Sequence, residues 1–199
     1  MTEALRRVSP WNIANYLTVL RLLLVPVFLG FLLADDGGNA GYRLIAAGVF
    51  LLAALTDRID GQIARSRGLI TSFGKLADPI ADKTLIGAAL VGLSLLDELW
   101  WWVTVVVLVR EIGVTVLRFV VIRHGVMPAG RGGKLKTGLQ TLAITLYLLP
   151  LTGVLSNVSV AVMVAAVVIT VVTGIEIVVK ALVLRTTSER ADMKRAARR

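Results

Sequence analysis

The chain contains no cysteine, and this absence excludes several kinds of site. Disulfide bonds, thiolate metal centres and a cysteine nucleophile are all ruled out. Histidine is nearly as scarce, because His124 is the one copy in 199 residues and no acidic residue stands beside it in the sequence. A nucleophilic triad built on serine or cysteine is therefore not indicated.

Charged residues are also few. They make up 18% of the chain, whereas 56% of its residues are hydrophobic, and the mean hydropathy is +0.80. These values exclude an ordinary water-soluble globule. Apolar runs of about 18 or more residues recur along the chain, and each can cross a hydrocarbon core roughly 30 Å thick as a helix. The sequence predicts an all-α membrane protein with several spans.

Six transmembrane helices are expected, at about 12–34, 43–66, 78–97, 99–123, 136–155 and 158–184. The breaks between them are short and rich in Gly, Asp, Asn and Ser, as turns are. None of them can hold a soluble domain. We therefore expect one six-helix transmembrane catalytic domain over residues 1–184, with a short amphipathic segment at about 1–11, and a basic tail at 185–199.

Basic residues divide unequally between the two sides of the membrane. The first, third and fifth breaks contain a single basic residue, Arg43, whereas the other breaks and both termini hold the rest. By the positive-inside rule the basic side is cytoplasmic, so both termini are expected in the cytosol. The net charge of +9 is thus explained by topology and by anionic lipid headgroups, with no need for nucleic acid.

Ionisable residues also lie inside the predicted spans, where each costs on the order of 3 kcal/mol at a helix centre. Glu176 and Lys180 stand four residues apart with the acid first, which predicts a structural ion pair. Four aspartates are more unusual, because they gather at the cytosolic ends of two neighbouring helices. The first two are three residues apart, the last two are four apart, and each pair shares a helical face: Asp57, Asp60, Asp78 and Asp82.

Four carboxylates in one pocket repel each other unless cations neutralise them. Oxygen ligands with no His or Cys nearby favour Mg²⁺ or Mn²⁺, and four of them can support two ions. Two such ions suit phosphoryl chemistry, because they neutralise a diphosphate and stabilise the charge on its leaving group. An ion network of these acids with Arg58, Arg65 and Lys75 is the structural alternative.

The string "DRIDGQIARSRGLITSFGKLADPIAD" resembles the signature of the CDP-alcohol phosphatidyltransferase family. All eight fixed positions of that signature match: Asp57, Asp60, Gly61, Ala64, Arg65, Gly74, Asp78 and Asp82. The resemblance extends to the six-helix layout of the family, from about Asn12 to Leu184.

This resemblance implies transfer of a phosphatidyl group from CDP-diacylglycerol to an alcohol, with release of CMP, in a homodimeric membrane enzyme. It implies that the four aspartates hold two Mg²⁺ or Mn²⁺ ions, and that Asp82 is also the general base for the acceptor hydroxyl. The expected contacts with CDP-diacylglycerol are Asn15, Thr18, Gly61, Arg65, Thr71 and Gly74.

Three further strings resemble one subgroup, the bacterial phosphatidylglycerophosphate synthases: "NIANYLTVLR", "REIGVTVLR" and "GKLKTGLQ". In the second string, Arg110 and Arg118 are close to two turns apart and share a helical face, with Glu111 placed to orient one of them. Together with the lysines of the third string they predict a pocket for a phosphate on the acceptor: Arg110, Arg118, Lys134 and Lys136. Topology alone also explains lysines at these positions.

A basic pocket beside the metal site favours glycerol 3-phosphate as the acceptor. Inositol 1-phosphate and phosphatidylglycerol are the alternatives within the same family. A small membrane transporter is the alternative from another class, but it predicts charges spread through the membrane depth rather than gathered at one face. The expected location is a bacterial plasma membrane, with the active site at the cytoplasmic face.

Overall fold

The computed structural model describes the backbone of residues 13–66, 72–121 and 132–196, and the side chains of residues 16–56, 80–117, 133 and 135–183. Within these residues the regular structure is entirely helical, which confirms the all-α prediction. The elements described are α1 (Ile13–Leu33), the 3₁₀ helix η1 (Ala34–Gly37), α2 (Ala40–Ser66), α3 (Ser72–Leu95), α4 (Trp101–Val121), α5 (Gly132–Leu148) and α6 (Val154–Ala196).

Several helices extend beyond the apolar runs from which they were predicted. α3 begins at Ser72 rather than at 78, and α6 continues to Ala196 instead of ending at 184. The reason is that backbone hydrogen bonds form a helix whatever the polarity of its side chains, so an apolar run marks only the part suited to lipid. Residues 185–196 of the expected tail are therefore a continuation of α6.

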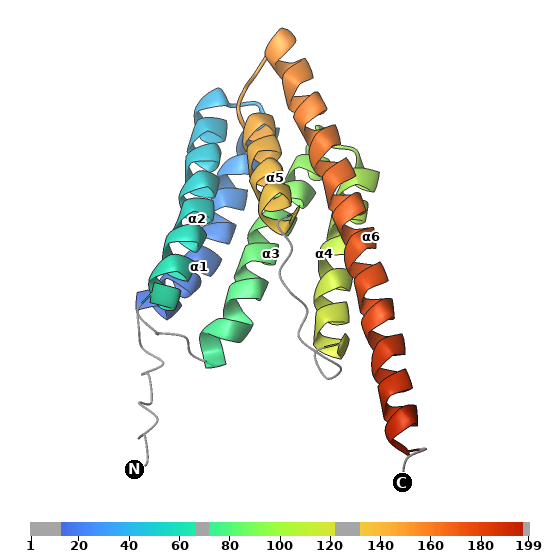
Figure 1. The fold of residues 1–199 in the computed structure, drawn as a ribbon. Coiled ribbons are helices and arrows are strands. Elements are labelled where there is room, and N and C mark those ends of the chain that lie inside the picture. The colour runs from blue at the N-terminus through green and yellow to red at the C-terminus, as the bar shows by residue number, and fades with distance from the viewer. Residues whose placement is uncertain (1–12, 67–71, 122–131, 197–199) are drawn as a thin grey trace. The chain divides into compact units, whose positions relative to one another are not determined.

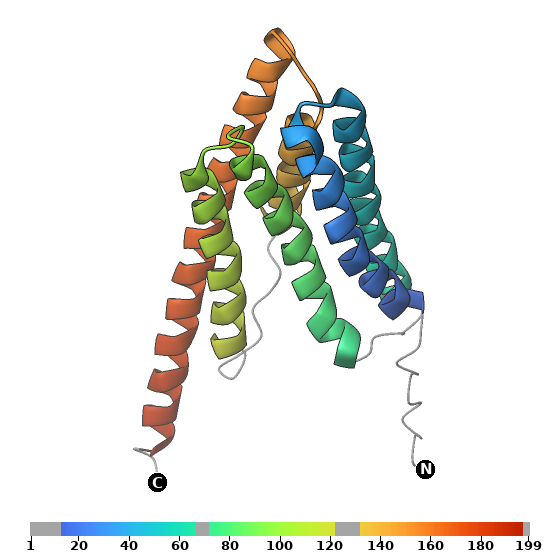
Figure 2. The same cartoon turned by 180° about the vertical axis from the view of Figure 1, so that it is seen from behind.

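The chain forms two compact units, the first from residues 1–99 and 144–156 and the second from residues 100–143 and 157–199. In the first unit α1 packs against both α2 and α3 (Figures 1 and 2). Val25, Phe28 and Leu32 form a buried stripe on α1, at the three- and four-residue spacing of one helical face. The rings of Phe28 and Phe50 pack at a centroid distance of 5.8 Å and a tilt of 45°.

A glycine lets α3 approach α1 closely. A Cβ atom on Gly92 would lie 2.7 Å from Cδ2 of Leu32, too near for any other residue unless the leucine side chain or one of the helices shifts. The buried face of α3 continues from this contact through Leu93, Leu90 and Leu85 toward the start of the helix. Close packing thereby fixes the helix that carries Asp78 and Asp82.

Asn39 defines the start of α2. Its Oδ1 accepts hydrogen bonds from the backbone N–H groups of Gly41 (2.9 Å) and Tyr42 (3.2 Å). This is the pattern of an N-cap residue, which satisfies donors that have no partner inside the helix. The cap explains why α2 begins at Ala40, before the apolar run expected from 43.

Arg43 joins three segments of the first unit. Its Nη1 and Nη2 atoms bind the two carboxylate oxygens of Glu98, with Nη2 2.6 Å from Oε2. Nη2 also donates to the carbonyl oxygen of Tyr147 (2.5 Å), and Nε donates to that of Leu148 (3.2 Å). Since these carbonyls lie at the end of α5, they lack donors from their own helix. One guanidinium therefore connects the first turn of α2, the segment after α3 and the end of α5.

Two stretches of the described helices are long and apolar enough to cross a membrane, Tyr16–Gly37 and Val154–Val183. The second stretch presents Val164, Val168 and Val172 on one face, each more than half exposed. An apolar face of this size is unsuited to water and suited to lipid. α5 has 17 residues, fewer than a typical span, and α2 and α4 each carry several charged residues within their length, so the count of six spans stays a prediction.

The predicted ion pair on α6 is confirmed. The Nζ atom of Lys180 binds Oε1 of Glu176, one turn earlier on the same helix. The two side chains are 50% and 52% exposed, so the pair lies on the surface of the second unit.

Candidate active site

The four predicted metal ligands lie at two neighbouring helix ends of the first unit. Asp57 and Asp60 belong to the last turns of α2, and Asp78 and Asp82 to the first three turns of α3. Both helix ends are found at the same end of this unit (Figures 1 and 2). The side chains of the first three aspartates are outside the described residues, so the meeting of the four carboxylates stays a prediction.

Asp82 is the member of this set whose side chain the structure describes. It is half-buried and stands at the start of the buried stripe that continues through Leu85, Ile86 and Ala89. These positions are three, four and seven residues further along, which places Asp82 on the packed face of α3. A carboxylate on this face is directed toward the other helices of the unit rather than toward lipid.

Polar side chains of α1 are buried near the same end of the unit. Thr18 and Arg21, one turn apart, are each 1% exposed. Of the predicted contacts with CDP-diacylglycerol, Thr18 is thus placed inside the helix packing. Asn15 lies on α1, Gly61 and Arg65 lie on α2, and Gly74 lies on α3. The side chains at these four positions are outside those described, and Thr71 lies outside the described residues altogether.

The donor chemistry of the aspartate cluster fits the expected metal. The segment from 57 to 82 offers four carboxylates and contains no His or Cys, so its ligands are oxygen atoms. Oxygen donors of this kind suit Mg²⁺ or Mn²⁺. No further group of three or more His, Cys, Asp or Glu side chains comes together among the side chains that the structure describes.

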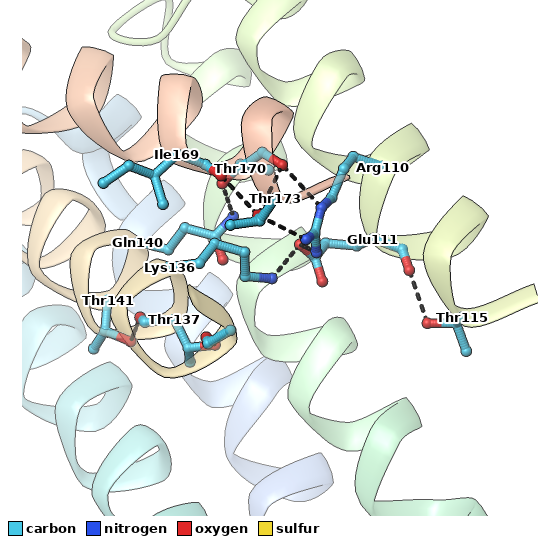
Figure 3. A network of polar contacts seen from close by, with 11 residues as sticks. Arg110, Glu111, Thr115, Lys136, Thr137, Gln140, Thr141, Ile169, Thr170 and Thr173 are labelled. Carbon is cyan, nitrogen blue, oxygen red and sulfur yellow. Dashed lines mark hydrogen bonds and ion pairs between the residues drawn. The ribbon is translucent and has the colours of Figure 1, made fainter. Parts of the chain in front are cut away.

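The second unit contains a buried cluster of charges, shown in Figure 3. Oε1 of Glu111 accepts from Nη1 of Arg110 at 3.1 Å and also binds Nζ of Lys136. The three side chains are 8–11% exposed. Glu111 therefore brings together two residues of the predicted acceptor pocket, one from α4 and one from α5. The prediction that Glu111 orients a cation is confirmed, and the contact extends to two cations.

α6 holds the same arginine from another direction (Figure 3). Nε of Arg110 donates to the backbone oxygen of Thr170 at 3.0 Å, and Nη2 donates to Oγ1 of Thr173 at 2.9 Å. The Thr173 hydroxyl in turn donates to the carbonyl oxygen of Ile169 at 2.7 Å. Gln140 of α5 donates from Nε2 to Oγ1 of Thr170 at 3.1 Å. The charged cluster is thus joined to three helices.

Sequence reasoning missed the contribution of α6. Thr170, Thr173 and Gly174 interrupt a run of valines and isoleucines at the spacing of one helical face, which is the signal that identifies a buried polar stripe. The other two members of the predicted acceptor pocket, Arg118 and Lys134, lie on α4 and α5 with side chains outside those described.

A model of the CDP-alcohol phosphatidyltransferase family matches residues 11–172. The chain belongs to this family. The matched region includes every predicted site residue, from Asn15 to Lys136. The family explains why an all-helical, strongly apolar chain carries an acidic signature of this spacing, since its members are transferases of the membrane.

Similar proteins of known name share most of their length with this chain. It is 56% identical over 171 residues to a probable phosphatidylglycerophosphate synthase of Mycobacterium tuberculosis, covering 86% of this chain and 82% of the relative. It is 38% identical over 149 residues to the CDP-diacylglycerol–glycerol-3-phosphate 3-phosphatidyltransferase of Bacillus subtilis, and the match covers 70% of this chain and 77% of the relative. The relative of that name from Rickettsia felis is 40% identical over 139 residues, and the match covers 69% of this chain and 75% of the relative.

Proposed function

We propose that this protein transfers the phosphatidyl group of CDP-diacylglycerol to sn-glycerol 3-phosphate, giving phosphatidylglycerophosphate and CMP. The names of its relatives support this reaction. The structural observation that supports a phosphate-bearing acceptor is the cluster in which Arg110 and Lys136 share the single carboxylate of Glu111. Arg110 and Lys136 bring cationic groups from two helices to the same carboxylate, and a phosphate accepts hydrogen bonds from groups of this kind.

In this reaction Asp57, Asp60, Asp78 and Asp82 hold two Mg²⁺ or Mn²⁺ ions. When bound, the ions supply charge neutralisation for the diphosphate and for its leaving group. The CDP-diacylglycerol is bound by residues of the first three α-helices and of the segment before α3: Asn15, Thr18, Gly61, Arg65, Thr71 and Gly74. The buried position of Thr18 supports its part in this set, because a hydroxyl in the helix packing is held in one orientation.

Asp82 acts as the general base. Its carboxylate takes the proton from the acceptor hydroxyl, whose oxygen forms a bond to the phosphorus of the phosphatidyl group. The bond between that phosphorus and the bridging oxygen of the diphosphate breaks, and CMP leaves with the electron pair. The half-buried position of Asp82 on the packed face of α3 supports this role, since the base must face the interior where the substrates meet.

We propose the following setting for the enzyme. The chain is a single catalytic domain over 1–184, with six transmembrane helices and both termini in the cytoplasm, followed by the basic segment 185–199. It works as a homodimer in a bacterial plasma membrane, and its active site opens to the cytoplasm. The unequal distribution of basic residues supports this orientation.

The first test is CMP release by the purified full chain in detergent. CDP-diacylglycerol is supplied with Mg²⁺ or Mn²⁺, and glycerol 3-phosphate, inositol 1-phosphate and phosphatidylglycerol are offered in separate reactions. We expect release with glycerol 3-phosphate, complete loss on chelation by EDTA, and recovery when excess Mg²⁺ or Mn²⁺ is added. Release with a different acceptor alone, or release that survives EDTA, contradicts the proposal.

Arg118→Ala tests the acceptor pocket. We expect KM for glycerol 3-phosphate to rise about tenfold while kcat changes little, because a contact with the acceptor phosphate is made equally in the ground state and the transition state. Lys180→Ala is the matched control, since it removes a cation from the exposed pair on α6. An unchanged acceptor KM in the Arg118 variant removes this residue from the pocket.

A further inference from the structure

We infer that α6 determines how the acceptor phosphate is bound, through Thr173 and Gly174, which together orient the guanidinium of Arg110. These two are positioning residues: they act on the acceptor through Arg110. This inference rests on the proposed acceptor site and adds a third helix to it. The predicted pocket drew only on α4 and α5.

The first observation is the way the donors of Arg110 are used. A guanidinium has five N–H groups. Three of them are bonded, to the carbonyl oxygen of Thr170, to Oε1 of Glu111 and to Oγ1 of Thr173. One N–H on each terminal nitrogen is not taken by any residue in the described part of the chain. Two such donors suit a phosphate, which accepts paired hydrogen bonds from arginine.

The second observation is the space that Gly174 leaves. A Cβ atom at this position would lie 3.0 Å from Cγ and 3.2 Å from Nε of Arg110. These distances are shorter than ordinary contacts, so an alanine would displace the arginine side chain by a few tenths of an ångström. The side chain of Arg110 thus lies directly against the backbone of α6, in a place that only glycine provides without displacement.

The third observation is that Thr173 holds Arg110 through its side chain. The hydroxyl hydrogen of Thr173 is donated to Ile169, so its oxygen faces Arg110 as an acceptor. Thr173 is 8% exposed, which shields this bond from competing solvent. Since Glu111 attracts Nη1 and Thr173 attracts Nη2, the guanidinium plane is fixed from two sides. Loss of either contact leaves Arg110 in place but free to rotate.

The test compares matched pairs of variants in the full chain. Thr173→Val removes the hydroxyl that binds Arg110, whereas Thr115→Val removes a hydroxyl whose hydrogen bond goes only to its own helix, at the carbonyl oxygen of Glu111. Gly174→Ala adds a methyl group against Arg110, whereas Gly113→Ala adds one on α4 where no atom lies within 4 Å. Thr173→Ser restores the hydroxyl and serves as the rescue.

We expect Thr173→Val and Gly174→Ala to raise KM for glycerol 3-phosphate about five- to tenfold, with KM for CDP-diacylglycerol unchanged within about twofold. The acceptor KM is expected to stay within about twofold of the wild-type value in the two controls and the rescue variant: Thr115→Val, Gly113→Ala and Thr173→Ser. Gly174→Ala separates positioning from stability, because the helix preference of alanine offsets the cost of displacing Arg110, so we expect the acceptor KM to rise while the melting temperature changes little. An unchanged acceptor KM in both Thr173→Val and Gly174→Ala overturns the inference. If Thr173→Val does not fold, the acceptor KM of Gly174→Ala alone tests the inference.

A binding measurement separates this inference from the proposed reaction. The melting temperature of the wild type and of each variant is recorded with increasing glycerol 3-phosphate. A wild type that is stabilised by glycerol 3-phosphate but releases no CMP disproves the reaction, and weaker stabilisation of Gly174→Ala then still supports the role of α6. A wild type that is not stabilised, or variants stabilised at the same concentrations as the wild type, overturn the inference.

Discussion

Asp82→Asn is expected to lower kcat for CMP release by about a thousandfold or more. Asparagine has nearly the shape of aspartate but neither its charge nor its ability to take a proton at neutral pH. The change therefore removes a general base, worth about 10²- to 10⁴-fold, and weakens a metal ligand in the same step. Asp57→Asn is expected to abolish turnover at ordinary metal concentrations too, because it removes a ligand of the proposed pair of ions.

The two variants are distinguished by their response to metal. Excess Mn²⁺ is expected to restore part of the activity of Asp57→Asn, since weaker binding can be overcome by concentration, whereas Asp82→Asn remains inactive. Asp36→Asn is the matched control, because Asp36 is exposed in η1 with a φ of 49°, a conformation that asparagine also adopts. Activity above a tenth of wild type in the Asp82 variant, with the protein folded, would disprove its assignment as the base.

Arg43→Ala is expected to destabilise the fold by about 2–4 kcal/mol, with little effect on the KM of either substrate. The change leaves Glu98 without its paired guanidinium and removes donors from the carbonyl oxygens of Tyr147 and Leu148. Unsatisfied buried polar groups cost more than the net gain of the bonds that they formed. Because Glu98 is 32% exposed, water recovers part of the loss, and the lower half of the range is expected.

The measurement is the melting temperature of the detergent-solubilised full chain at a fixed scan rate, where about 1 kcal/mol corresponds to about 2–4 °C for a protein of this size. Arg43→Lys keeps the charge but loses the paired geometry, so its melting temperature should lie between those of the wild type and Arg43→Ala. Glu176→Gln is the control, since it breaks an exposed pair and should shift stability by less than about 0.5 kcal/mol. An equal effect from Arg43→Ala and Glu176→Gln would show that the contacts of Arg43 do not hold the unit together.

Local sequence signals predicted the helices well but their ends less well. Hydrophobic periodicity located the six α-helices that the structure describes, but not the 3₁₀ helix η1, because lipid and packing both select apolar side chains along an α-helix. It placed the start of α3 at 78 and the end of α6 at 184, because polarity marks the expected membrane boundary rather than the end of the backbone hydrogen bonding. The start of α2 depends on a cap at Asn39, a signal that hydropathy does not contain.

The candidate site shows the same difference between features that local sequence signals predict and features that they do not. The aspartate signature was recognised because its residues stand within 26 positions of one another on two consecutive segments, so their spacing is itself the pattern. An orienting contact of Glu111 with one of Arg110 and Arg118 was predicted for the same reason, since all three lie close together in the chain, and the structure shows that the partner is Arg110. The contacts of Arg110 with α6 span 60 and 63 residues, and no local period relates such distant positions.

By itself, the sequence determined that this protein is helical and strongly apolar and that it carries the acidic signature of its family. Each of these depends on composition or on short spacings. Only the tertiary structure decided which partners the buried charges take: Arg43 binds Glu98 and the end of α5, and Glu111 joins Arg110 to Lys136. The physical reason is that a buried charge must find an opposite charge or a polar group nearby in space, and the packing of helices far apart in the chain determines which groups are near.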